Sequence, residues 1–206
     1  MVRHEIDGRV VLTTSFGIED QIIADAVFTQ NLEIDVVTFD TGRLFPETFE
    51  LWARTEARYR RRVRALYPDR DSLETLIAGQ GVNGFRASIE ARHVCCGVRK
   101  VEPLRRALAG FDAWISGRKR FHGALRTFLP VIELSGAKIK INPLARWSKL
   151  RIEEEFARHG LPRHPLEADG FLSIGCLPCT GRVAAGADHR AGRWAGRGKT
   201  ECGIHL

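Results

Sequence analysis

The segment RVVLTTSFGIED (residues 9–20) decides how the fold of this chain is interpreted. Its first half, RVVLTT, is a short apolar run with β-branched residues, which is typical of a buried strand. A glycine turn follows, and the residues from Glu19 to Thr29 then have helical spacing. Backbone N–H groups at such a turn, together with the helix dipole, can bind an anion. The segment therefore predicts a strand, an anion-binding loop and a helix.

The same alternation of strands and helices continues along the chain. The run IDVVTFD (34–40) predicts a second buried strand, and Pro46 fits the first turn of a helix that extends to about Arg62. We expect further strands at 62–66 and 113–117, further helices at 99–108 and 149–159, and a hairpin at 131–144. This order predicts an α/β fold, with a mostly parallel sheet and helices on both of its faces.

Ligands of such sheets bind at the carboxyl ends of the strands. That rule places three polar loops at one edge of the predicted sheet: TTSFGIED (13–20), FDTGR (39–43) and ISGRKR (115–120). We assign residues 1–185 to one α/β domain. Residues 186–206 carry glycines every few positions without periodicity, and they predict a mobile tail.

The composition is that of a soluble globular protein, because 44% of the 206 residues are hydrophobic and 28% are charged. The first residues do not resemble a signal peptide, and no run approaches the ~20 apolar residues of a membrane helix. These features predict a cytoplasmic protein with no membrane partner. The net charge of +7 favours an anionic ligand, since the planar arginine side chain suits phosphate and sulfate oxygens. On charge alone, nucleic acid is an alternative partner.

Four of the five cysteines form two close pairs, Cys95 with Cys96 and Cys176 with Cys179, and Cys202 lies four positions from the end. In a cytosolic protein, clustered cysteines more often bind metal or carry out chemistry than form disulfides. Four thiolates can hold a zinc ion or an iron–sulfur cluster. Adjacent ligands splay apart, which suits a [4Fe–4S] cluster better than one ion, and we favour the cluster.

The anion loop also resembles the phosphate loop of the ATP-pyrophosphatase-like superfamily, which has the adenine-nucleotide alpha-hydrolase fold. That loop usually reads Ser-Gly-Gly-x-Asp-Ser, whereas this chain has SFGIED at positions 15–20. The bulk of Phe16 and the carboxylate of Asp20 would crowd and repel a triphosphate. A nucleotide with a single phosphate is the better expectation.

Several motifs together resemble the assimilatory adenylyl-sulfate (APS) reductases, the iron–sulfur branch of the phosphoadenylyl-sulfate (PAPS) and APS reductase family. They are CCGVRKVEPL (95–104), SIGCLPCT (173–180) and ECGIHL (201–206), with SFGIEDQ, DTGRLFPET and ISGRKR upstream. The likeness extends from about Val10 to His205. The PAPS branch keeps the tail cysteine but lacks the four paired cysteines, so the resemblance implies APS.

The resemblance implies a role for each cysteine. Cys202 would attack the sulfur of APS and release AMP, leaving an S-sulfocysteine that reduced thioredoxin, or glutaredoxin, converts to sulfite. One [4Fe–4S] cluster per chain would be held by the other four: Cys95, Cys96, Cys176 and Cys179. From its position three residues after Cys202, His205 could lower the pKa of that thiol, help to dock the tail, or be an exposed terminal histidine. The sequence leaves the oligomeric state open, homo-oligomers included.

Candidate substrate-binding residues come from the loops and from basic side chains at motif positions, because an anionic substrate and an attacking thiolate need cations around them. The loop candidates are Ser15, Phe16, Gly17, Asp40, Thr41, Gly42 and Gly117. The basic candidates are Arg99, Lys100, Arg118, Arg126, Arg190 and Arg193.

Three other functions compete with that of an APS reductase. A PAPS reductase would share the tail cysteine. An ATP-using RNA-thiolation enzyme would need the Gly-Gly-x-Asp phosphate loop, which this chain lacks. A basic metal-binding module for nucleic acid would explain the charge and the paired cysteines but neither SFGIED nor the tail.

Overall fold

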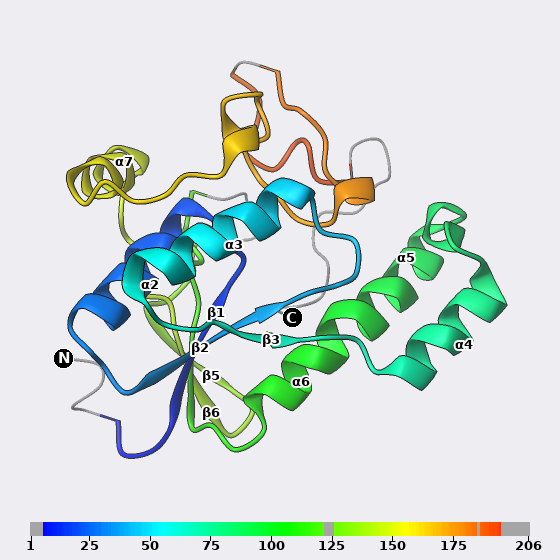
Figure 1. The fold of residues 1–206 in the computed structure, drawn as a ribbon, viewed down its shortest axis with the longest axis horizontal. Helices are drawn as coiled ribbons and strands as arrows, with labels where there is room; N and C mark the ends of the chain where they lie inside the picture. Colours follow the sequence, from blue (N-terminus) through cyan, green and yellow to red (C-terminus); the bar gives the residue numbers. More distant parts are fainter. Residues whose placement is uncertain (1–5, 122–125, 185, 195–206) are drawn as a thin grey trace.

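The computed structural model describes residues 6–121, 126–184 and 186–194. Within them lies a six-stranded sheet with the strand order β3-β2-β1-β4-β6-β5. The strands are β1 (Val10–Thr14), β2 (Ile34–Phe39), β3 (Arg64–Leu66), β4 (Ala113–Ile115), β5 (Ile132–Ser135) and β6 (Lys138–Ile141). All neighbours are parallel except β5 and β6, which form the expected antiparallel hairpin. The prediction of a mostly parallel α/β sheet is confirmed (Figure 1).

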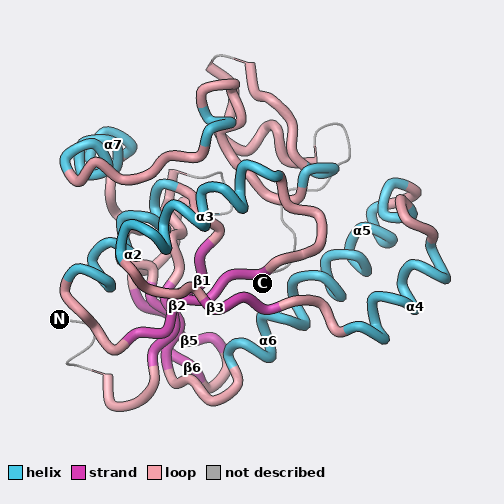
Figure 2. Tube along the Cα trace, in the orientation of Figure 1, coloured by secondary structure: helices cyan, strands magenta, loops and turns pink. Residues whose placement is uncertain are grey.

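Alternate residues of β1 pack against opposite layers of helices. Leu12 faces one side, where it belongs to a core with α2 (Ile18–Thr29), α3 (Pro46–Tyr59) and α7 (Lys149–Arg158). Val11 faces the other side, where it packs with residues of α6 (Glu102–Leu108). Figures 1 and 2 show α2 and α3 on one side of the sheet and α6 on the other, so helices cover both faces as expected.

The helix around the cysteine pair is longer than predicted. It begins at Ile89 rather than near Arg99, because the Ser88 side chain caps α5 (Ile89–Cys96) by accepting a hydrogen bond from the backbone N–H of Ala91. A π-helical turn, η2 (Gly97–Val101), then joins α5 to α6. Such turns occur often at functional sites, and this one directly follows the cysteines.

One helix was missed altogether. The helix α4 (Arg70–Gln80) follows β3, and its first turn is capped by Asp69, whose carboxylate accepts a hydrogen bond from the backbone N–H of Ser72 at 2.9 Å. Only Leu76 of α4 is buried, so the helix has almost no apolar face from which it could be predicted. A short turn, η1 (Gly84–Arg86), connects it to α5.

The chain after α7 has little regular structure and crosses above the carboxyl ends of the strands, in yellow to orange in Figure 1. It contains two short turns, η4 (Pro165–Glu167) and η5 (Leu177–Cys179). The backbone N–H of Leu177 binds the carbonyl of Arg43 at 2.9 Å, and Thr180 pairs with Arg193. Trp194 is buried, so the first part of the predicted tail packs on the domain. The predicted mobility of the tail stays a prediction, and Cys202 and His205 lie outside the described residues.

No helix in the described ranges is long and apolar enough to cross a bilayer.

Candidate functional site

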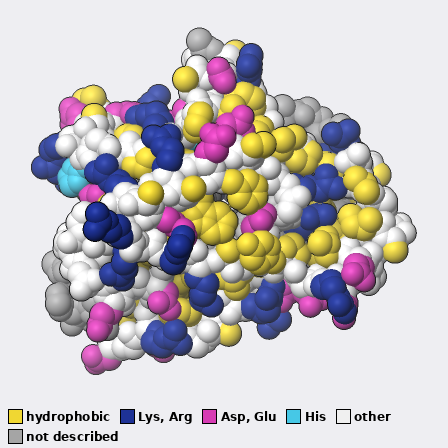
Figure 3. Space-filling view, viewed as in Figure 1, with side chains coloured by type: hydrophobic (Ala, Val, Ile, Leu, Met, Phe, Trp, Pro, Cys, Tyr) yellow, Lys and Arg dark blue, Asp and Glu magenta, His cyan; other side chains and the backbone are white. Residues whose placement is uncertain are grey.

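A cavity of about 330 Å³ opens at the carboxyl ends of β1, β2 and β4, and we call it the edge cavity. All three predicted loops line it, together with residues 172–175, His189, Arg190 and Arg193 from the crossing segment. Its volume is within the range of small-molecule sites. On the face in Figure 3, Lys and Arg side chains are interspersed with acidic and hydrophobic side chains.

The loop between β1 and α2 is organised around Asp20. The backbone N–H of Ser15 donates to Asp20 Oδ2 at 2.6 Å, and the Ser15 hydroxyl donates to the same oxygen at 2.9 Å. The backbone N–H groups of Gly17 and Gly117 also bind this carboxylate. Burial raises the pKa of Asp20, against the lowering effect of these bonds. The N–H groups that were predicted to bind a ligand anion are therefore already bonded within the chain.

Phe16 does not act as the barrier that was expected. Its backbone has a positive φ of 61°, and its N–H donates to Thr14 Oγ1 at 2.9 Å. The ring is 2% exposed and stacks on Trp52 with 5.8 Å between ring centroids. The core thus accommodates the bulk that was predicted to crowd a triphosphate.

The second loop links the edge cavity to the paired cysteines. Gly42 has a positive φ of 68° and donates its N–H to Asp40 Oδ1 at 2.8 Å, so these two residues shape the loop. Thr41 is buried and lines the edge cavity, and its hydroxyl lies 3.3 Å from Cys176 Sγ. The carbonyl of Thr41 accepts a hydrogen bond of 2.5 Å from Arg99 Nη1. Arg99 therefore positions this loop from the π-helical turn.

All four paired cysteines line a second cavity of about 20 Å³, the cysteine cavity. Cys95 and Cys96 come from the last turn of α5, and Cys176 and Cys179 from either end of η5. All four are free thiols. Within the described ranges, no three His, Cys, Asp or Glu side chains converge closely enough to hold one metal ion.

Basic side chains surround these thiols. Burial alone would raise the pKa of Cys176, but the charge of Lys100, the Thr41 hydroxyl and Arg193 outweigh it and bring that pKa below its usual value. Burial raises the pKa of Cys95 and of Cys179, and Arg92 Nη1 lies 3.6 Å from Cys179 Sγ. Lys100 and Arg193 line both cavities, so they form a shared wall between the edge cavity and the cysteines.

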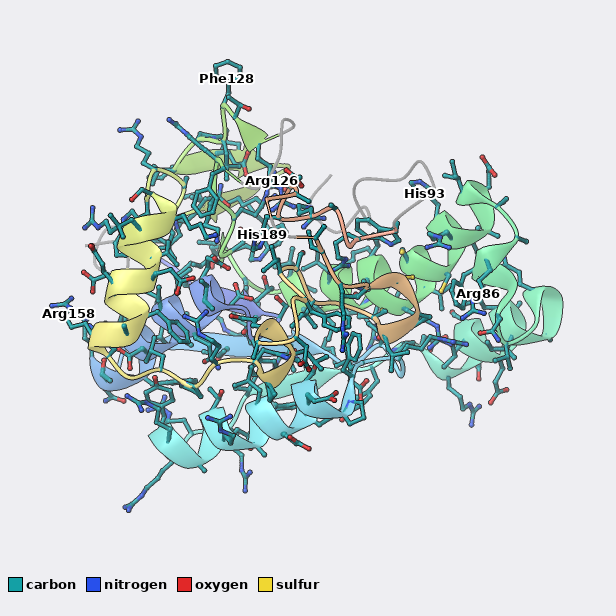
Figure 4. All side chains as sticks on the ribbon, turned by 90° about the horizontal axis from the view of Figure 1, so that it is seen from above. Arg86, His93, Arg126, Phe128, Arg158 and His189 are labelled. Carbon is teal, nitrogen blue, oxygen red and sulfur yellow. The ribbon has the colours of Figure 1, made fainter. Side chains whose placement is uncertain are left out.

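Most of the predicted substrate-binding residues come together around the edge cavity. Those lining it are Ser15, Phe16, Gly17, Thr41, Lys100, Gly117, Arg118, Arg126, Arg190 and Arg193. Three do not line it: Arg99 lines the cysteine cavity, and Asp40 and Gly42 shape the second loop. Figure 4, seen from above, shows Arg126 near His189, and both line the edge cavity.

Several polar residues of the cavity region were not predicted. Lys119 is buried and pairs with Glu19, and burial lowers the pKa of Lys119 to about 6. Burial, together with nearby cations, lowers the pKa of His189 to about 4, so that its ring is neutral at pH 7. Lys119 lies inside the quoted ISGRKR stretch, which is a signal that could have found it. For His189 the signal is weaker, namely its place next to the predicted Arg190.

His164 is a third residue that was missed. Its Nδ1 accepts a hydrogen bond from the backbone N–H of Leu166 at 3.3 Å, and its Nε2 lies 3.0 Å from Thr48 Oγ1. With Nδ1 as acceptor, Nε2 carries the proton and donates to Thr48. Burial lowers the pKa of His164, which keeps this neutral form. His164 therefore joins the crossing segment to α3 beside the edge cavity.

Comparisons with known proteins agree with this geometry. Residues 9–182 match the family model described as "Phosphoadenosine phosphosulfate reductase domain". The chain is 46% identical over 205 residues to an adenosine 5′-phosphosulfate reductase of Sinorhizobium fredii (strain USDA 257), covering 98% of this chain and 82% of that protein. It is 40% identical over 208 residues to one of Allochromatium vinosum, covering 99% of this chain and 81% of that protein.

Solved structures have the same fold. A PAPS reductase from Candida auris in a phosphate complex superposes with a TM-score of 0.72 at 26% identity, covering 87% of this chain and 86% of the other. An FMN adenylyltransferase from Candida glabrata has a TM-score of 0.56 at 17% identity, covering 84% of this chain and 57% of the other, which is a likeness of fold alone.

Proposed function

The chain belongs to the phosphoadenosine phosphosulfate reductase family, and from that premise we propose that it reduces APS to sulfite and AMP in cytoplasmic sulfate assimilation. Relatives at 40% and 46% identity carry the APS reductase name. The observation that carries the proposal is the shared wall: Lys100 and Arg193 line both the edge cavity and the cysteine cavity. An anionic substrate bound in the edge cavity would therefore share two cations with the paired cysteines.

The proposed reaction uses Cys202 as nucleophile. Its thiolate attacks the sulfur of APS, the bond from sulfur to the phosphate oxygen breaks, and AMP leaves with the bonding electron pair. A thiolate of reduced thioredoxin, or of glutaredoxin, then attacks Cys202 Sγ, and sulfite leaves with the electron pair of the broken S–S bond. The second thiol of the donor resolves the mixed disulfide and restores the Cys202 thiol.

The described residues would bind the substrate and stabilise the leaving phosphate. Negative charge grows on the phosphate as AMP departs, and cations held in place beforehand lower the energy of that state. Such cations lie around the edge cavity: Lys100, Arg118, Arg126, Arg190 and Arg193. The buried Thr41 would hold the second loop between the substrate and Cys176.

We further propose that Cys95, Cys96, Cys176 and Cys179 hold one [4Fe–4S] cluster. Four thiols line one cavity, and the charge of Lys100 and Arg193 helps to lower the pKa of one of them, Cys176. One zinc ion would need its ligands to converge at about 2.3 Å, whereas no three described His, Cys, Asp or Glu side chains converge on a point. A bound cluster would tie α5 to the segment around η5 and place its charge beside Lys100.

APS is favoured over PAPS as substrate. The four paired cysteines are present, and the relatives named APS reductases are more similar in sequence than the solved PAPS reductase, at 40–46% against 26% identity. If the site hydrogen-bonds the ribose 3′-hydroxyl, a 3′-phosphate would clash and leave buried groups unpaired. A kcat/KM for PAPS as high as that for APS would overturn this preference.

The proposal is tested with anaerobically purified protein and APS in the absence of a donor. We expect about one AMP per chain and a sulfonate adduct on the Cys202 peptide by mass spectrometry, followed by sulfite release when a dithiol is added. The variant Cys202→Ser should lose turnover by at least ~10³-fold, because a serine hydroxyl is barely ionised at neutral pH.

The matched control is the variant Cys95→Ser, and the two variants are compared by their iron content. Cys202→Ser should keep its colour and iron, whereas Cys95→Ser should lose both. An adduct on another cysteine, or normal turnover by Cys202→Ser, would refute the nucleophile. One zinc without acid-labile sulfide would refute the cluster.

A further inference from the structure

Four donors converge on one buried carboxylate at the edge cavity. The Ser15 N–H and hydroxyl bind Asp20 Oδ2 at 2.6 and 2.9 Å, and the N–H groups of Gly17 and Gly117 complete the set. These groups come from the ends of two different strands, β1 and β4, and from the start of α2. Asp20 is 8% exposed, so the carboxylate lies within the wall and not on the surface.

This set of donors is one that proteins use for anions. Backbone N–H groups can only donate, and a helix N-terminus adds favourable potential for negative charge. Concave groups of N–H donors bind phosphates for the same reason. We call the three N–H groups of Ser15, Gly17 and Gly117 the amide seat. Asp20 supplies the acceptor from inside the chain, where a phosphate oxygen would otherwise serve.

The neighbours of the amide seat are shaped around the carboxylate. A Cβ built on Gly117 would clash with Asp20 Oδ1, so the loop after β4 has a glycine where the carboxylate lies. The adjacent Glu19 pairs with the buried Lys119. In the described part of the chain no Lys or Arg pairs with Asp20, which is held by N–H and O–H groups alone.

We propose that Asp20 is a specificity-determining residue, an internal anion that fills the amide seat and excludes nucleotides with a triphosphate tail. A phosphate beside this carboxylate would meet like charge in a poorly solvated place and would find its donors taken. The anionic end of the substrate is therefore bound by basic side chains. The statement about how the substrate is bound rests on the proposed function.

The competing explanation is a purely structural one. Asp20 is the third residue of α2, and an acidic residue there can cap the helix by accepting the N–H of the N-cap residue, here Gly17. A cap alone predicts that removing Asp20 lowers stability and nothing more. The proposal predicts in addition that the emptied seat gains affinity for phosphates.

The test compares Asp20→Ala with Asp25→Ala. Both variants remove a buried carboxylate from α2, but Asp25 binds the side chains of Tyr59 and His159, each at 2.7 Å, instead of the amide seat. The Tm of each is measured against inorganic phosphate and pyrophosphate, and ATP and AMP binding are measured by calorimetry. Because the cations of the edge cavity also bind phosphate, Tm should rise in both variants, and the rise should be larger in Asp20→Ala than in Asp25→Ala. Its ATP affinity relative to AMP should rise at least roughly tenfold.

A second variant keeps the test decisive if Asp20→Ala folds poorly. Asp20→Asn preserves the shape but presents an NH₂ group to the donors, so we expect a smaller shift toward ATP in the same direction. A phosphate-dependent rise in Tm no larger than that of Asp25→Ala, with an unchanged ratio of ATP to AMP affinity in the variants that fold, would overturn the proposal. The phosphate titration does not involve APS turnover. Absence of APS reduction with the larger phosphate response in Asp20→Ala would therefore refute the proposed function and leave this inference intact.

Discussion

The loop around Asp20 and the cavity around the paired cysteines lie on adjoining walls of the site and hold buried polar groups in opposite ways. In the loop, N–H donors from two strand ends meet one acceptor from the same chain. In the cysteine cavity, four free thiols lie among basic side chains such as Arg92, Lys100 and Arg193. In the loop, the donors are already bonded to the Asp20 carboxylate, so they are not available to a ligand. The cysteine cavity offers soft, ionisable donors of the kind that bind metal.

The contrast predicts its largest effect at Cys176, a buried thiol with a lowered pKa. It is buried, contacts the Thr41 hydroxyl, and Lys100 and Arg193 favour its ionised form. Cys176→Ser should lose most of its iron and should destabilise the fold by several kcal/mol, because binding of a metal group contributes to folding free energy. Iron analysis and thermal unfolding measure both effects. An iron content equal to that of Cys202→Ser would mean that Cys176 is not a ligand.

A second prediction concerns the amide seat and Gly117. Gly117→Ala should destabilise the fold by about 1–3 kcal/mol, because its Cβ would clash with the Asp20 carboxylate. Adding Asp20→Ala should remove part of that penalty, with a coupling of about 1–2 kcal/mol in a double-mutant cycle.

Gly79→Ala provides the control for this cycle. No atom lies within 4 Å of the Cβ position at Gly79, which belongs to α4. That substitution should be neutral or slightly stabilising, by up to about 1 kcal/mol, because alanine favours a helix over glycine. Additive effects of Asp20→Ala and Gly117→Ala would show that the carboxylate does not fill the space beside Gly117.

The smallest expected effect comes from a carboxylate that binds a backbone N–H far from the site. Glu56 accepts hydrogen bonds from the Val63 N–H at 2.9 Å and from Trp52 and Arg62. Burial alone would raise the pKa of Glu56, but these bonds outweigh it and lower that pKa. Because the pKa of Glu56 is lower in the folded than in the unfolded protein, its charge stabilises the fold at pH values above the unfolded-state pKa. This stabilisation is lost as the pH falls through the folded-state pKa.

Glu56→Gln should therefore cost about 0.5–1.5 kcal/mol at pH 7 and progressively less below about pH 4.5. Urea unfolding of both proteins between pH 7 and pH 3 measures the difference. A constant difference across that range would mean that the lost charge plays no part. The phosphate response of this variant should equal that of the unmodified protein, which makes it a further control for the amide seat.

The sequence was informative wherever short-range patterns are strong. The β-branched runs of β1 and β2 predicted buried strands, and the order of elements predicted the parallel sheet. Because the carboxyl ends of parallel strands share one edge, that order also brought the three loops together around the edge cavity. The spacing of Cys176 and Cys179 and the adjacency of Cys95 and Cys96 were enough to indicate a cysteine site.

Other features depend on contacts between residues far apart in the chain. The helix α4 has one buried residue, so its amphipathic pattern was too weak to predict. The ring of Phe16 was expected to face the anion, but the core receives it because Trp52 of α3 offers an aromatic surface. The pair of Lys119 with Glu19 joins residues 100 positions apart, and no local pattern encodes such a partner.

The amino-acid order alone was thus enough to place strands, loops and thiols, because hydrophobic periodicity and residue spacing are local properties. Which donor meets which acceptor was decided only in the folded chain. The sequence did not show whether the Asp20 carboxylate faces the ligand or the backbone. In the folded chain it accepts hydrogen bonds from the backbone N–H groups of Ser15, Gly17 and Gly117. A buried carboxylate is stable only where donors surround it, and those donors come together only when β1, β4 and α2 have packed.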